Sequence, residues 1–81
     1  MNETSKPKIA TFQIKIRVSK EDSAMVYFTL EANEGLCFYS TLDSTPGQEF
    51  RVLEIQGAIE FETELKRILG TLQKSFLIQY L

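Results

Sequence analysis

The alternation of apolar and polar positions predicts a strand, a helix and a strand, and then the same three elements again. Thr11–Val18 has the two-residue period of a β-strand. Its apolar face is Phe12, Ile14, Ile16 and Val18, and its polar face is Gln13, Lys15 and Arg17. Ser19 suits a helix N-cap with Asp22 three residues later, and Gly35 suits a helix end, so a helix is expected between them.

This first helix has a weak apolar stripe. The expected buried face is Ala24, Tyr27, Phe28 and Glu31. Val26 and its neighbours are poor helix formers, and the run Met25–Leu30 resembles a strand in composition. The capping residues before and after this run favour a helix.

Two strands joined by a turn are expected next. Leu36–Leu42 alternates, with Leu36, Phe38, Ser40 and Leu42 on one face and Cys37, Tyr39 and Thr41 on the other. Pro46 and Gly47 favour a turn, and Phe50–Ile55 has the composition of a strand that Gly57 ends.

The second helix has the strongest periodic signal in the chain. The residues that recur at its 3.6-residue period are Phe61, Leu65, Ile68, Leu69 and Leu72. The following segment, Phe76–Leu81, reads as a fourth strand or as an extension of this helix. The order βαββαβ predicts an α+β fold, the two-layer ferredoxin-like plait, with an antiparallel sheet and two helices on one face. Residues 1–8 are expected to form a disordered tail and 9–81 a single domain.

The third strand is apolar on both faces, which leaves its orientation open. If Phe50 and Val52 face the helices, Leu53 and Ile55 join Tyr39 on the open face of the sheet, beside Lys15 and Arg17. Such an apolar patch would mark a protein contact. The alternative is a bulge near Leu53 that turns all four side chains of the strand inward. We favour the patch, and so predict a candidate interface of Tyr39, Leu53, Ile55, Lys15 and Arg17.

Composition narrows the chemistry. The chain has 81 residues, a formal net charge of −2, no histidine and one cysteine. The absence of histidine removes the usual neutral-pH base and the commonest metal ligand, so we expect no enzyme, no metal and no cofactor. An acidic domain gains little from phosphate contacts, so nucleic acid is not an expected partner. The lone cysteine and the lack of a long apolar run predict a soluble cytoplasmic protein, without a membrane partner.

A short motif follows the first predicted helix. The segment Glu31-Ala32-Asn33-Glu34-Gly35-Leu36, followed by Ser40-Thr41-Leu42-Asp43, has the pattern E-x-x-E-G-L, a strand and T-L-D. It resembles a family of short, uncharacterised bacterial domains of unknown function. The resemblance covers roughly residues 15–72 and implies no activity that can be transferred.

Two further groups of residues have a functional and a structural interpretation. Glu31 and Glu34 form a weak acidic patch that would bind a divalent ion through water, but a solvated helix end is the favoured interpretation. Cys37 is favoured as a partly buried strand residue over a reactive thiol. The ligand-sensing plaits of the ACT type have glycine in the loop after the first strand, and 18–22 has none.

These observations predict a small non-catalytic interaction module that self-associates as a homodimer through its sheet or binds another protein. The alternative is a regulatory domain that senses a small ligand or a divalent ion. An RNA binder or an enzyme is disfavoured.

Overall fold

The computed structural model describes residues 10–33, 35–43, 47 and 49–81. It contains β1 (Thr11–Ser19), α1 (Lys20–Ala32), β2 (Phe38–Asp43), β3 (Phe50–Ala58), a short 3₁₀ turn (Ile59–Phe61), α2 (Glu62–Leu72) and β4 (Gln79–Tyr80). The predicted α+β class and the order of elements are confirmed. The predicted tail of residues 1–8 lies outside the described residues.

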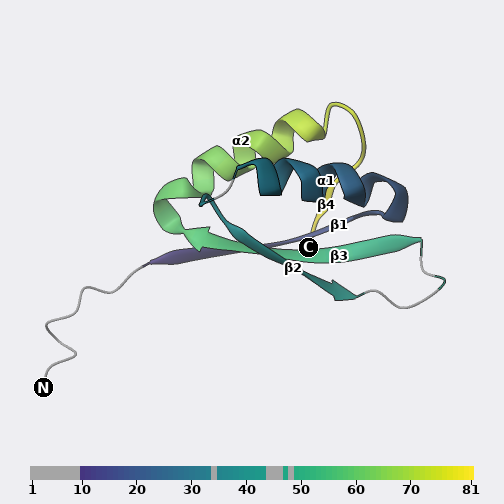
Figure 1. Cartoon of the computed structure of the whole chain (residues 1–81), viewed down its shortest axis with the longest axis horizontal. Coiled ribbons are helices and arrows are strands. Elements are labelled where there is room, and N and C mark those ends of the chain that lie inside the picture. Colours follow the sequence, from purple (N-terminus) through teal and green to yellow (C-terminus); the bar gives the residue numbers. More distant parts are fainter. Residues whose placement is uncertain (1–9, 34, 44–46, 48) are drawn as a thin grey trace, which may run out of the picture.

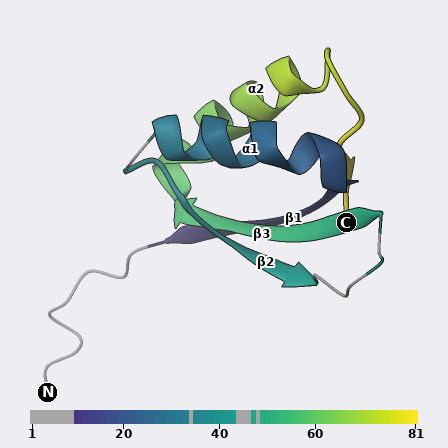
Figure 2. The same cartoon turned by 45° about the vertical axis from the view of Figure 1, so that its right-hand side comes forward.

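The four strands form one antiparallel sheet in the order β2-β3-β1-β4. Strand β3 therefore lies between β1 and β2, and the segment after α2 returns to the free edge of β1. Both helices cover the same face of this sheet, and no helix of the described residues lies on the opposite face (Figures 1 and 2). Between the two interpretations of Phe76–Leu81, the structure has the strand, although only Gln79 and Tyr80 are assigned to it.

The core lies between the sheet and the helix layer. It contains the predicted apolar face of β1, and Leu65 and Leu69 from α2 join the same cluster. The inward face of α2 is therefore confirmed. The predicted face of α1 is wrong by about one position, because its buried residues are Ser23, Val26 and Leu30, whereas Phe28 is 69% exposed.

The start of α1 follows the capping chemistry that the sequence predicts. The Ser19 hydroxyl accepts a hydrogen bond of 3.0 Å from the Asp22 amide and donates one of 2.8 Å to the Asp22 carboxylate. One of the free amides at the helix start is satisfied in this way, which fixes where β1 ends and α1 begins.

Gly57 does not end the third strand as expected but lies within it. A Cβ atom at this position would be 2.7 Å from the Leu36 carbonyl oxygen and 2.8 Å from a ring carbon of Phe12. Strand β3 continues to Ala58 because glycine lets β1 and the chain before β2 approach it closely.

We expect Gly57→Ala to lower the free energy of unfolding by about 1–3 kcal/mol, because the Leu36 carbonyl belongs to the backbone and cannot rotate away. Gly70→Ala is the matched control, since an added Cβ there meets no atom within 4 Å and alanine favours the helix by roughly 1 kcal/mol. Urea unfolding of both variants measures the difference. Equal stability of the two proteins would contradict the close approach at Gly57.

Candidate interaction surface

The face of the sheet opposite α1 and α2 is called the open face. Lys15 and Arg17 lie on it, as predicted, because their β1 neighbours Ile14 and Ile16 are buried. Its other members include Gln13 of β1, Phe38 and Ser40 of β2, Phe50, Val52, Glu54 and Gln56 of β3, and Gln79 and Leu81 near the end of the chain.

The predicted positions of Leu53 and Ile55 are wrong. Both side chains are 0% exposed and belong to the core, where they pair across the sheet with Ile16 and Ile14. The strand has the inverse orientation, with Phe50 and Val52 on the open face, and it pairs in unbroken register with β1 from end to end. The alternative of a bulge that turns all four apolar residues inward is therefore wrong as well.

The physical reason lies in the polar neighbours of those residues. Glu54 and Gln56 share one face of β3, and burial of a carboxylate against the helices would be costly. They therefore face solvent, which turns Leu53 and Ile55 inward. Arg51 obscures this signal in the sequence, since it lies on the helix side at the end of the sheet, opposite Val18.

Tyr39 also lies on the helix side and not on the open face. It is opposite Ile55, and its ring stacks on that of Tyr27 in α1 with centroids 5.2 Å apart. Its hydroxyl donates a 2.5 Å hydrogen bond to Glu31, and this bond raises the pKa of Tyr39 to about 12. The Tyr27 hydroxyl forms a 2.6 Å hydrogen bond with the Thr41 hydroxyl. These contacts attach β2 to α1 and give Tyr39 a structural role.

Large apolar side chains stand out on the open face. Phe38 is 81% exposed and Phe50 is 46% exposed, and Leu81 is also exposed. The Arg17 guanidinium lies 5.1 Å from the centre of the Phe50 ring, and its Nε donates a 2.9 Å hydrogen bond to the Gln79 side chain. One end of the open face thus combines an aromatic ring, a cation and aliphatic groups, as protein interfaces do.

The middle of the open face is charged. Lys15 lies directly across from Glu54, but Lys15 forms no ion pair within the part of the chain that the structure describes. The Glu54 carboxylate instead accepts hydrogen bonds from the side-chain amides of Gln13 at 2.5 Å and Gln56 at 3.0 Å. The carboxylate is held in place, while the ammonium group has no acidic partner among the described residues.

The acidic patch is only partly visible. Glu31 is exposed and accepts the bond from Tyr39, whereas Glu34 lies outside the described residues. Among the residues that the structure describes, no three acidic, histidine or cysteine side chains are placed to hold a metal ion. Cys37 is half-buried, as predicted, but it precedes β2 and does not belong to the strand. Burial raises the pKa of its thiol, which disfavours the reactive thiolate.

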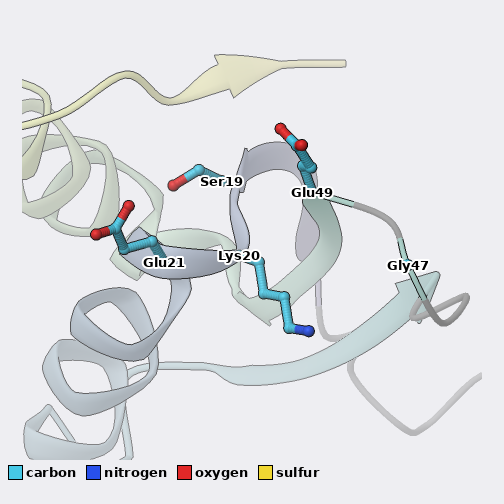
Figure 3. Close-up of a pocket in the computed structure, with 5 residues that line it drawn as sticks. All are labelled: Ser19, Lys20, Glu21, Gly47 and Glu49. Carbon is cyan, nitrogen blue, oxygen red and sulfur yellow. The ribbon is translucent and has the colours of Figure 1, made fainter.

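A depression at the start of α1 is lined by Ser19, Lys20, Glu21, Gly47 and Glu49 (Figure 3). It lies after β1, where a ligand-sensing plait would bind its ligand. The Ser19 hydroxyl is already used in the cap. The lining holds two carboxylates, from Glu21 and Glu49, and one ammonium group, from Lys20, whose side chain points away from both carboxylates. This lining does not favour an anionic metabolite.

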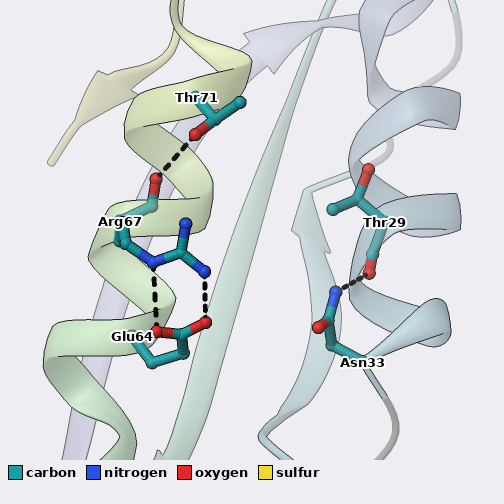
Figure 4. A network of polar contacts seen from close by, with 5 residues as sticks. All are labelled: Thr29, Asn33, Glu64, Arg67 and Thr71. Carbon is teal, nitrogen blue, oxygen red and sulfur yellow. Dashed lines mark hydrogen bonds and ion pairs between the residues drawn. The ribbon is translucent and has the colours of Figure 1, made fainter.

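The exposed side of α2 is polar and internally paired. Two guanidinium nitrogens of Arg67 donate hydrogen bonds to the Glu64 carboxylate, and this contact lowers the pKa of Glu64 (Figure 4). Glu62 and Lys66 form a second ion pair on this helix, at 3.2 Å. These solvated pairs contrast with the exposed apolar groups of the open face.

No family model, curated protein or solved structure matches this chain. The resemblance to the uncharacterised bacterial domains therefore stays a prediction. Within the described part of the chain, neither helix has the length and apolar character needed to cross a bilayer.

Proposed function

We propose that this domain is a ferredoxin-like plait that acts in the cytoplasm as a non-catalytic interaction module, with a protein docked on its open face. The interleaved strand order β2-β3-β1-β4 supports the plait, since β3 separates the two strands that flank α1. The observation that carries the function is the exposure of Phe38 and Phe50 on the open face. Phe38 lies beside Gln56 and Phe50 lies six residues away at the other end of β3, so these apolar groups flank the charged middle of the face. Large apolar side chains exposed in this way support a protein contact.

A protein partner fits the open face better than RNA. Aromatic side chains beside Lys15 and Arg17 would suit stacked bases, but Glu54 lies at the centre of the face and would repel phosphate. The chain as a whole carries a net charge of −2. A protein partner can instead present charges that pair with both Glu54 and the two cations, which a phosphate backbone cannot do.

Photo-cross-linking in the native cell tests the docking face. We expect a photoactivatable phenylalanine analogue at Phe38 to form a covalent adduct with a protein, because a docked surface would cover this side chain. Phe28 is the matched control, since it is a similarly exposed phenylalanine on the outer side of α1. Electrophoresis and mass spectrometry identify the adducts.

An adduct at Phe38 that is absent at Phe28 would support the proposed function. Equal labelling at the two positions, or none at Phe38, would contradict it.

A further inference from the structure

We propose that the partner on the open face is a second copy of this chain, related by a two-fold axis that runs parallel to the strands between β1 and β3. This inference rests on the proposed function, because it names the partner for the same face. It follows from the strand order and from the positions of the charges on the open face.

Rotation about such an axis exchanges the strands but keeps each position along them. It lays β1 of one copy on β3 of the other, and β2 on β4, because the strand order is β2-β3-β1-β4. Each β1 residue then faces a β3 residue of the second copy, and that residue has the same number as its cross-strand neighbour within its own chain. Lys15 is paired with Glu54 in the register of β1 and β3, so Lys15 of each copy faces Glu54 of the other.

The two charged groups are available for this contact. Lys15 forms no ion pair with any described residue, and Glu54 is oriented by the amides of Gln13 and Gln56. A two-fold contact makes the interaction twice. Both copies therefore contribute one cation and one anion near the centre of the interface.

A two-fold axis perpendicular to the strands is disfavoured by the same charges. It would lay β1 on β1 and β3 on β3, and an axis at the level of Ile16 would then place Lys15 of each copy opposite Arg17 of the other. Like charges across an interface oppose association.

The apolar groups of the open face fit the parallel axis too. Strand β2 overlies β4 of the second copy. Leu81 of one chain then lies opposite Ser40 of the other and diagonally next to the exposed Phe38, which is two residues further along β2. Arg17 overlies Val52 of the second copy and remains stacked on Phe50 of its own chain. The apolar residues thus flank the central charges on both sides.

A double charge reversal tests the axis. The double variant Lys15→Glu with Glu54→Lys exchanges the two charges, so the net charge of the chain is unchanged. Between two mutant chains, Glu at position 15 faces Lys at position 54, and both ion pairs across the interface are formed again. We expect the double variant to self-associate as tightly as the wild type, and Lys15→Glu alone to weaken association about ten-fold or more. Sedimentation equilibrium gives the dissociation constants, and circular dichroism confirms folding.

Mixing the double variant with the wild type distinguishes the two axes. With the parallel axis every contact in a mixed dimer joins like charges, so we expect mixed dimers below the roughly one half that random pairing gives. With the perpendicular axis the mixed dimer would gain opposite charges and exceed that fraction. Native mass spectrometry counts the species after one chain is isotope-labelled, since the two proteins have the same composition.

A mixed fraction of about one half or more would overturn the proposed axis. A wild-type chain that stays monomeric at high concentration would overturn the second copy as partner. In that case an adduct of Phe38 with a different protein would leave the proposed function intact.

Discussion

Leu53→Glu is expected to unfold the domain. Leu53 is 0% exposed and pairs with Ile16 at the centre of the sheet, beneath the helix layer. A carboxylate there would be buried without a partner, which costs several kcal/mol. Since small domains have total stabilities of about 5–15 kcal/mol, this cost is comparable to the whole free energy of unfolding. Near-ultraviolet and far-ultraviolet circular dichroism with thermal melting measures the loss.

Val52→Glu is the matched control, because Val52 is the adjacent residue of the same strand and lies on the open face. We expect this variant to remain folded and to lose self-association in sedimentation experiments. If Leu53→Glu melted like the wild type and dissociated into monomers, the inward orientation of β3 would be wrong, and Leu53 would belong to the interface.

Leu65→Ala is expected to lower the free energy of unfolding by about 2–5 kcal/mol. Leu65 is 0% exposed and lies in the core cluster with Ile14 and Ile16, so truncation leaves a cavity under α2. In a domain of 81 residues such a loss unfolds a large share of the molecules at physiological temperature. Urea unfolding with a common m-value gives the difference.

Lys66→Ala is the control for Leu65→Ala. Lys66 is the next residue of α2, is exposed, and loses only its ion pair with Glu62. An exposed pair of this kind contributes roughly 0–1 kcal/mol. A loss at Lys66 as large as that at Leu65 would show that the assigned inward face of α2 is incorrect.

The start of α1 and the face of α2 were predictable because local chemistry decides them. Ser19 and Asp22 cap α1 through bonds between residues three apart, which the sequence displays directly. The apolar residues of α2 are concentrated on one stripe, so its inward face needs no knowledge of its neighbours. In α1 the apolar residues are spread around the helix, and the packing against the sheet selects Val26 and Leu30.

The candidate site was only half predictable. Lys15 and Arg17 alternate with strongly apolar residues, so β1 has one possible orientation. Strand β3 has apolar residues on both faces, and local pattern does not decide between them. The cost of burying Glu54 decides the orientation of β3, but Arg51 on the opposite face of the strand weakens that signal in the sequence. For this reason Phe50 and Val52 were not predicted to lie on the open face. Phe38 was missed as well, because Tyr39 beside it in β2 was placed on the open face.

The sequence by itself thus determined the order of elements as far as α2, the cap of α1, the faces of β1 and α2, and the absence of histidine chemistry. Each of these depends on residue type or on contacts between near neighbours in the chain. Only the tertiary structure decided the face of β3, the close approach at Gly57 and the strand at Gln79–Tyr80. These features depend on which distant segments share the sheet. The backbone N–H and C=O groups of a strand form hydrogen bonds only with the segments that the fold brings beside it.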